Sequence, residues 1–260
     1  MCETCGCAVV TEMPVATQTI TVMREILDQN STQAAHNRAH FDAHRVLALN
    51  LMSAPGSGKT ALLERTLDEL AGRFRCAVIE GDLETDNDAR RIRRHGVPAI
   101  QITTGATCHL DASMVHEALH QLPLAGLDVL FIENVGNLVC PASFALGTHA
   151  DVALVSVPEG DDKPAKYPVM FRGASLVLIS KADLLPVFEE FSVEAVSTAV
   201  RALANPAPVL TVSAKTGLGL EEWIGWLSAA VAARRAFRQA AGQPGPSRTS
   251  ADVARLAESS

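Results

Sequence analysis

A glycine-rich octapeptide, SAPGSGKT at residues 53–60, is the segment whose residue types point most directly to chemistry. Small residues let backbone N–H groups turn toward phosphate oxygens, and a helix that begins there adds the positive end of its dipole. A lysine in this position reaches the β- and γ-phosphates, and the hydroxyl after it can bind Mg²⁺. The segment predicts nucleoside triphosphate binding, although Ser53 stands where the general pattern has glycine, and a chance glycine turn is the alternative. The predicted phosphate-binding residues are Gly56, Ser57, Gly58, Lys59 and Thr60.

Two carboxylates, Asp82 and Glu133, end apolar runs that are predicted to be strands. Open α/β sheets bind ligands at the carboxyl ends of their strands. We expect Asp82 to orient the attacking water, and Asp82, Glu133 and Thr60 to hold Mg²⁺. This makes Lys59 and Asp82 the predicted catalytic residues; the alternative is that the two carboxylates cap the turns after their strands.

Three thiols lie within six residues near the N-terminus, at Cys2, Cys5 and Cys7. Thiolates spaced in this way suit soft and borderline ions such as Zn²⁺, Ni²⁺ or Cu(I). With the α-amine as a fourth ligand, a square-planar Ni²⁺ site becomes the preferred hypothesis. A redox pair is the alternative, but no predicted helix follows the motif to lower a thiol pKa.

A second group of metal-ligand types lies inside the predicted domain. Cys108 and His109 follow one predicted strand and Cys140 follows another, so the three residues make a partial metal site that a dimer partner could complete. Histidines also recur every fourth residue, at positions 36, 40 and 44 and at positions 116 and 120. This spacing permits metal binding, while solvent-exposed surface histidines are the alternative.

Seven apolar runs alternate with helical patterns after residue 45, which predicts an α/β fold with a mostly parallel sheet flanked by helices. The strand candidates are residues 45–52, 75–82, 99–103, 128–134, 151–157, 175–181 and 208–214. Helical spacing predicts two helices before the sheet, near residues 19–30 and 31–44, and a closing helix over 221–240. The expected organisation is a flexible metal-binding arm (1–17), N-terminal helices (18–44), a nucleotide-binding domain (45–240) and a disordered tail (241–260).

Composition excludes several classes of protein. The chain has 260 residues, of which 48% are hydrophobic, yet no apolar run approaches the roughly 18 residues of a membrane helix. The formal net charge of −7 lacks the basic footprint of a nucleic-acid-binding protein. No basic leader with an apolar stretch opens the sequence, so we expect a cytoplasmic protein in which six cysteines remain reduced.

Two loops late in the chain resemble the guanine-recognition loops of GTPases: SKAD at 180–183 and SAKTG at 213–217. By this resemblance, the Asp183 carboxylate accepts hydrogen bonds from guanine N1–H and from the exocyclic amine. Adenine lacks this pair of donors. Lys181 lies along the base, and Ala214 and Lys215 bind from the second loop. Ser180 stands where the usual motif has asparagine, which leaves the strength of guanine binding in question.

The ordered series of motifs resembles the hydrogenase nickel-incorporation GTPases, from the N-terminal thiols through SAPGSGKT, EGDLETDNDA, GATCHLDA, ENVGNLVCPA, EGDDKPAKYP and SKADLL to SAKTG. The resemblance implies a P-loop GTPase fold, GTP and GDP with Mg²⁺, and a nucleotide- or metal-dependent homodimer. It implies nickel at Cys2, Cys5 and Cys7, and nickel or zinc at Cys108, His109 and Cys140. The implied partners are a small zinc-containing nickel chaperone and the hydrogenase large-subunit precursor.

Three other functions fit parts of the sequence. One is a metallochaperone GTPase for another nickel or cobalt enzyme, such as urease or a cobalamin-dependent mutase. Another is a metal-binding module in which hydrolysis is vestigial. A small-molecule kinase also uses a phosphate loop, but the guanine loops argue against it.

Overall fold

The computed structural model describes residues 15–82, 87–105 and 107–242. The N-terminal thiols Cys2, Cys5 and Cys7 and the predicted tail beyond residue 242 lie outside the described residues. The strands are β1 (Leu47–Ser53), β2 (Cys76–Asp82), β3 (Ala99–Thr103), β4 (Val129–Glu133), β5 (Ala150–Ser156), β6 (Leu176–Ser180) and β7 (Val209–Thr211). The α-helices are α1 (Val15–His44), α2 (Lys59–Leu70), α3 (Asn87–Arg93), α4 (Ala112–Leu119), α5 (Lys163–Lys166), α6 (Pro168–Gly173), α7 (Val193–Ala202) and α8 (Leu220–Gly242). Three short 3₁₀ turns are η1 (Cys140–Ala142), η2 (Val157–Glu159) and η3 (Ala182–Leu184).

All seven predicted strands are present, and within the described residues they form one parallel sheet of order β3-β2-β4-β1-β5-β6-β7. The central strands are buried along nearly their whole length, which explains their continuous apolar runs. Because every strand points the same way, the strand ends at Ser53, Asp82, Glu133 and Ser180 lie at one edge of the sheet. The predicted α/β fold with a parallel sheet is therefore confirmed.

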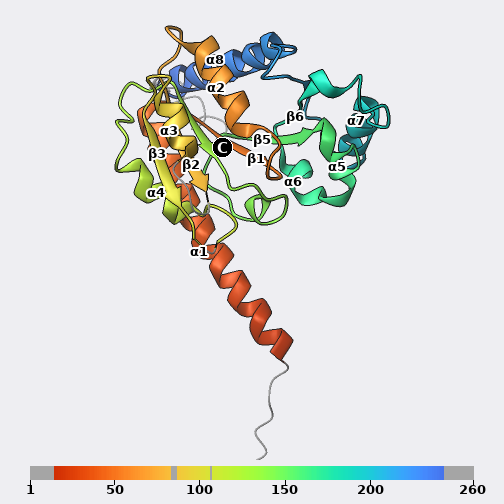
Figure 1. Cartoon of the computed structure of the whole chain (residues 1–260). Helices are drawn as coiled ribbons and strands as arrows, with labels where there is room; N and C mark the ends of the chain where they lie inside the picture. The colour runs from red at the N-terminus through yellow and green to blue at the C-terminus, as the bar shows by residue number, and fades with distance from the viewer. Residues whose placement is uncertain (1–14, 83–86, 106, 243–260) are drawn as a thin grey trace, which may run out of the picture.

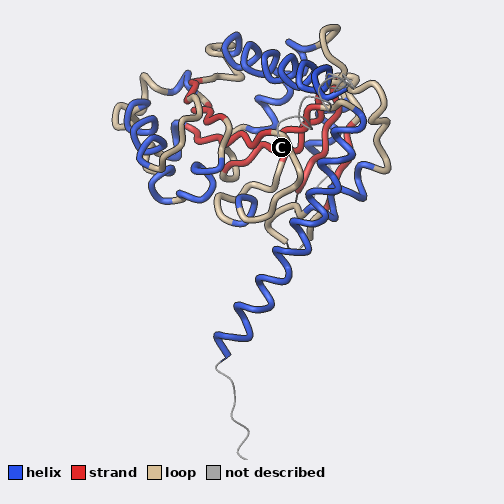
Figure 2. Tube along the Cα trace, turned by 180° about the vertical axis from the view of Figure 1, so that it is seen from behind, coloured by secondary structure: helices blue, strands red, loops and turns tan. Residues whose placement is uncertain are grey.

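Helices cover both faces of the sheet (Figures 1 and 2). On one face, α2, α3 and α8 pack their apolar side chains on β1, β2 and β4, with Trp223 of α8 buried at the centre. Trp223 Nε1 donates to Thr66 Oγ1 of α2 at 2.8 Å, which satisfies its polar group inside the core. On the other face, α1 and α4 cover one half of the sheet and α6 and α7 cover the other.

The predicted pair of N-terminal helices is a single helix, α1, which runs through residues 30 and 31 without a break. Ser31 and Thr32, at the predicted boundary, are residue types that often cap helices. Instead, their hydroxyls donate to the carbonyl oxygens of Leu27 and Asp28, four residues back, at 2.8 and 3.0 Å. The hydroxyls are satisfied inside the helix, so nothing ends it there.

Two asparagines attach α1 to the start of α4. Asn30 accepts from the Ala112 amide at 2.9 Å and donates to the Ala145 carbonyl at 2.9 Å. Asn37, fully buried, donates to the Ala112 carbonyl at 2.7 Å. The first turns of α1 extend away from the body of the molecule (Figure 1), whereas its second half is fixed by these bonds.

The predicted closing helix over 221–240 corresponds to α8, Leu220–Gly242. None of the helices within residues 15–82, 87–105 and 107–242 combines the length and the hydropathy needed to cross a lipid bilayer.

Candidate nucleotide and metal sites

The phosphate loop connects the end of β1 to the start of α2. Gly56 and Gly58 have φ angles of 75° and 87°, a left-handed conformation that glycine adopts without a Cβ clash. No described side chain caps the N-terminus of α2, so its first amides face the loop. This arrangement suits an anion such as a phosphate group.

Lys59 and Thr60, the first residues of α2, are both buried. Lys59 Nζ donates to Ser53 Oγ at 2.9 Å, across the mouth of the loop. A serine in place of the first glycine of the general pattern therefore gives the lysine a partner. The Thr60 hydroxyl donates to Glu133 Oε1 at 2.8 Å, which brings two hard oxygen ligands together.

A cavity of about 380 Å³ lies over the loop. Both predicted carboxylates line it, with Asp82 at the end of β2 and Glu133 at the end of β4. Arg91 of α3 also lines it, and its guanidinium is paired with Glu64 at 2.6 Å and Asp88 at 2.9 Å. The cavity thus has a lysine and an arginine on its walls beside a group of carboxylates.

A third carboxylate, Glu80, lies beside this site and was missed by the sequence analysis. It is the register partner of Glu133 on the neighbouring strand, and both side chains are buried. Burial, followed by the charge of Glu133, raises the pKa of Glu80 well above its usual value. Burial likewise raises the pKa of Glu133. An acidic residue inside an otherwise apolar strand was the signal that could have identified it.

Glu80 Oε1 and Glu133 Oε2 are buried and have no hydrogen-bond partner on any other described residue. The two carboxyl groups hydrogen-bond to each other, with the protonated Glu80 donating to Glu133. Hard carboxylate oxygens beside the Thr60 hydroxyl are the donor set that Mg²⁺ prefers. The residues present therefore fit a magnesium ion.

Glu159 is a second residue that the sequence analysis did not place in the site. Its Oε2 accepts from Ser57 Oγ at 2.8 Å, and from the amide and hydroxyl of Ser156 at 2.8 and 2.6 Å. These bonds connect the end of β5 to the phosphate loop. The pattern Ser156-x-x-Glu159, which is that of a capping box, could have indicated the contact.

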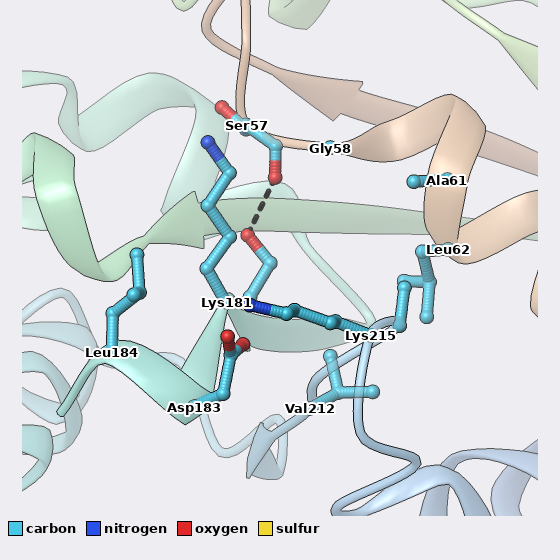
Figure 3. A pocket seen from close by; sticks show the side chains of 11 residues that line it. Ser57, Gly58, Ala61, Leu62, Lys181, Asp183, Leu184, Val212 and Lys215 are labelled. Atoms are coloured by element: carbon cyan, nitrogen blue, oxygen red, sulfur yellow. Dashed lines mark hydrogen bonds between the residues drawn. The ribbon is translucent and has the colours of Figure 1, made fainter.

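A second cavity, of about 330 Å³, adjoins the loop and shares Gly58 with the first (Figure 3). The SKAD and SAKTG loops form its walls together with Ala61 and Leu62 of α2. Lys181, at φ 55°, reaches back to donate from Nζ to the Gly56 carbonyl at 2.7 Å. The four residues predicted to bind the base all line this cavity: Lys181, Asp183, Ala214 and Lys215.

The two predicted guanine loops are joined by a hydrogen bond. The Ser213 hydroxyl, at the end of the second loop's strand, donates to Asp183 Oδ1 at 2.7 Å. This bond holds the Asp183 carboxylate in place. An apolar cavity with one oriented carboxylate on its wall can bind a base that offers two adjacent N–H donors, as guanine does.

The internal metal-ligand group is brought together in space. The ligand atoms of Cys108, His109 and Cys140 lie within 4.8 Å of one another, and all three residues are half-buried. The two Sγ atoms are 3.0 Å apart, and both cysteines are free thiols. His109 stacks on Phe144 with ring centroids 4.0 Å apart, which orients the imidazole.

The protonation of this group reflects its surroundings. Hydrogen bonding with Cys108, followed by burial, raises the pKa of Cys140. Burial lowers the pKa of His109, so its neutral form is favoured. His109 Nδ1 is buried and lacks a hydrogen-bond partner among the described residues. Two thiols and a neutral imidazole are suitable ligands for Ni²⁺ or Zn²⁺.

The repeated histidines are also partly brought together. His36 and His40 of α1 lie beside His116 of α4, with ligand nitrogens within 4.8 Å of one another. His44, one turn later on α1, does not belong to this group. The sequence analysis considered each helix alone and missed that the two sets meet.

The comparisons with known proteins agree with this architecture. A family profile described as "CobW/HypB/UreG, nucleotide-binding domain" matches residues 47–211. The hydrogenase maturation factor HypB of Escherichia coli (strain K12) is 53% identical over 203 residues, which cover 78% of this chain and 70% of the relative. The hydrogenase/urease maturation factor HypB of Helicobacter pylori (strain J99) is 45% identical over 212 residues, covering 80% of this chain and 86% of the relative.

Solved structures give the same result. HypB from Helicobacter pylori, crystallised in complex with nickel, superposes with a TM-score of 0.75 at 43% identity, over 84% of this chain and 99% of that one. HypB from Archaeoglobus fulgidus superposes with a TM-score of 0.73 at 39% identity, over 78% of this chain and 99% of that one. The chain therefore belongs to the CobW/HypB/UreG family of nucleotide-binding proteins, in its group of HypB hydrogenase maturation factors.

Proposed function

We propose that this chain is a GTPase that binds nickel and assists its insertion into the precursor of a nickel–iron hydrogenase. Support comes from the names of the relatives, which are hydrogenase maturation factors, and from the nickel complex of the Helicobacter pylori structure. In this proposal GTP hydrolysis is coupled to dimerisation and metal release. Its partners are a small zinc-containing nickel chaperone and the hydrogenase large-subunit precursor.

Guanine is held in the cavity between the SKAD and SAKTG loops. Asp183 accepts from the base, while the stem of Lys181 lies along it and the Ala214 amide and Lys215 bind from the other side. The 2.7 Å bond from Ser213 supports this role, because it fixes the carboxylate before the base arrives. An Asp that is already oriented loses less conformational entropy on binding.

The triphosphate lies along the loop formed by Gly56, Ser57 and Gly58, with Lys59 on the β- and γ-phosphates. Thr60, Asp82 and Glu133 would hold Mg²⁺, which neutralises phosphate charge when it is bound. Asp82 orients the attacking water, and Lys59 stabilises the charge that develops on the transferred phosphoryl group. The 2.8 Å contact between the Thr60 hydroxyl and Glu133 Oε1 supports this assignment.

The observation that carries the proposal is a direct connection between the two sites. Asn134, next to Glu133, accepts a hydrogen bond from the Leu110 amide at 3.1 Å, and Leu110 follows His109. Leu110 also packs against Gly81, beside Asp82, so closely that a Cβ on that glycine would lie 2.7 Å from its side chain. A change around the γ-phosphate therefore moves a backbone that carries a metal ligand.

Nickel is the cargo of this mechanism. The thiols Cys2, Cys5 and Cys7 bind it first in the proposal, and Cys108, His109 and Cys140 form the nucleotide-sensitive site, which can also hold zinc. Coupling of this kind requires that the metal affinity differ between the nucleotide states.

The test is a nickel titration of a Cys2→Ser/Cys5→Ser/Cys7→Ser variant, once with GDP and once with a non-hydrolysable GTP analogue. The expected difference in affinity is about 5–150-fold, the usual range of allosteric coupling. Equal affinities in the two states would contradict the proposal.

An Asn134→Ala variant tests the connection itself. It is expected to reduce the nucleotide dependence of nickel binding. The matched control is Asn205→Ala, which removes another buried asparagine with comparable backbone bonds and lines neither nucleotide cavity. If both variants change the coupling equally, general destabilisation is the cause and Asn134 has no special role.

Urease is a second candidate target, because the Helicobacter pylori relative is named a hydrogenase/urease maturation factor. Co-purification from cells that express both enzymes separates the two targets. Recovery of a urease component alone would assign the chain to urease, while recovery of the hydrogenase precursor supports the first proposal.

A further inference from the structure

Four imidazoles from two helices gather near the surface, and none of them belongs to the thiol cluster. His36 and His40 come from α1, and His116 and His120 come from α4. Their ring centroids are 4.8 Å apart for His36–His40, 4.8 Å for His36–His116 and 4.7 Å for His116–His120. One ring nitrogen from each of the first three histidines lies within 4.8 Å of the other two.

The proton of one of these imidazoles can be assigned from its neighbours. The Asn37 amide nitrogen donates to the carbonyl oxygens of Ala112 and Leu146, at 2.7 and 3.2 Å, which fixes the orientation of the amide. Asn37 Oδ1 is therefore the atom that lies 3.1 Å from His116 Nδ1, and that nitrogen must carry the hydrogen. His116 Nε2 keeps its lone pair and faces His120.

The free nitrogen is well placed for an ion. His116 Nε2 and His120 Nε2 lie 3.2 Å apart. Two ligands at zinc–nitrogen distances of about 2.0–2.1 Å and a tetrahedral angle are separated by about 3.3–3.4 Å. The spacing of these two nitrogens is therefore close to that of two ligands on one ion. A direct N–H···N hydrogen bond is the alternative arrangement.

The neighbourhood also favours neutral rings, the form that binds metal. Burial and the nearby histidines lower the pKa of His40 and His116. The hydrogen bond that His116 Nδ1 donates to Asn37 Oδ1 is typical of metal-ligating histidines, whose other nitrogen usually donates to a carbonyl or carboxylate oxygen. The two helices are joined by Asn30 and Asn37, so the ring positions rest on a rigid support.

We propose that His36, His40, His116 and His120 form a binding site for a borderline divalent transition metal such as Ni²⁺ or Zn²⁺. Imidazole ligands suit both ions. The site shares no ligand with the N-terminal thiols or with the group of Cys108, His109 and Cys140. It stands independently of GTP hydrolysis, because none of its residues lines the nucleotide cavities.

The test uses the full-length chain with the five cysteines of the two thiol groups replaced by serine. Equilibrium dialysis against Ni²⁺ alone, followed by metal analysis, is expected to give one ion per chain without thiolate-to-metal charge-transfer absorption. Replacing His40 and His116 by glutamine is expected to remove that ion. In the otherwise unaltered chain, the same two substitutions should lower the nickel content by one equivalent.

Two further variants keep the result interpretable. His36→Gln/His120→Gln changes the two exposed rings, and is expected to weaken binding at least about tenfold while the melting temperature stays unchanged. His44→Gln, also exposed and on α1, is the matched control and should bind like the parent. The proposal is overturned if the chain with the five serine substitutions binds no ion, if the histidine variants retain it, or if His44→Gln loses it equally.

Discussion

The Ser180 hydroxyl donates a hydrogen bond to the Ser57 main-chain carbonyl at 2.7 Å, so the base loop and the phosphate loop are joined directly. Ser180 is the residue at which the SKAD loop departs from the usual asparagine of guanine-binding motifs. Both partners are buried. The shorter serine side chain therefore still connects the two halves of the nucleotide site.

Ser180→Ala should weaken GDP binding by up to about tenfold, because it removes a buried hydrogen bond worth about 0.5–1.5 kcal/mol and leaves the Ser57 carbonyl without this donor. Titration with a fluorescent GDP analogue measures the effect. Ser197→Ala on α7 removes another serine hydroxyl bonded to a carbonyl and serves as control. Unchanged GDP affinity in Ser180→Ala would show that the connection does not matter for binding.

Asp183→Asn should change the base preference of the site from guanine to xanthine. The variant loses two hydrogen bonds from guanine to a charged acceptor, each worth about 1.5–3 kcal/mol, so GTP affinity is expected to fall at least about 100-fold. The new amide can donate to the xanthine C2 carbonyl. Competition between GTP and XTP measures the exchange, with Asp68→Asn, on α2 outside the cavity, as control. Equal losses for both nucleotides would mean that Asp183 does not read the base.

Gly136→Ala should impair nucleotide binding because there is no room for the added methyl group. A Cβ at this position would lie 2.8 Å from Pro55 Cα, so the segment after Glu133 and the phosphate loop must move apart. We expect at least tenfold weaker GTP binding, at roughly 1.4 kcal/mol per factor of ten. Gly225→Ala, on α8, meets no atom within 4 Å and should bind GTP normally. Normal binding by both variants would contradict the close approach.

His149 should make stability depend on pH. Its Nδ1 accepts from the Ala48 amide at 3.0 Å, and Nε2 lies 3.1 Å from Asp42. Burial, which outweighs Asp42, lowers the pKa of His149 to about 4. Between pH 6.5 and 4 the unfolded chain takes up a proton that the folded chain does not, so the unfolding free energy falls as the pH falls.

His149→Gln should reduce this loss of unfolding free energy at low pH. Urea unfolding at pH 7 and at pH 4.5 measures the difference. The charged groups that face the ring are Asp42, Arg38 and Arg234. The control is His44→Gln, at an exposed position. A loss of stability that is equal in the parent and in His149→Gln would contradict the assignment.

Local sequence patterns predicted the strands correctly, while nucleotide binding by the loops after β1, β6 and β7 stays a prediction. Strand runs such as residues 128–134 are apolar because both faces of a parallel strand are covered, and that property is visible residue by residue. The loop at 53–60 needs glycines at particular positions, which is also a local requirement. The break predicted near residue 30 was wrong, because the hydroxyls of Ser31 and Thr32 bond within the helix.

The tertiary structure alone decided which distant residues meet. Cys108 and Cys140 are 32 residues apart and share a cluster because their loops leave the sheet at the same edge. Glu80 faces Glu133 through the register of two strands, and His36 meets His116 only because α1 packs on α4. Periodicity and motifs reflect the structural requirements of one segment at a time. The register of the sheet and the packing of helices depend on the whole chain, and they determine where its metal ligands and carboxylates come together.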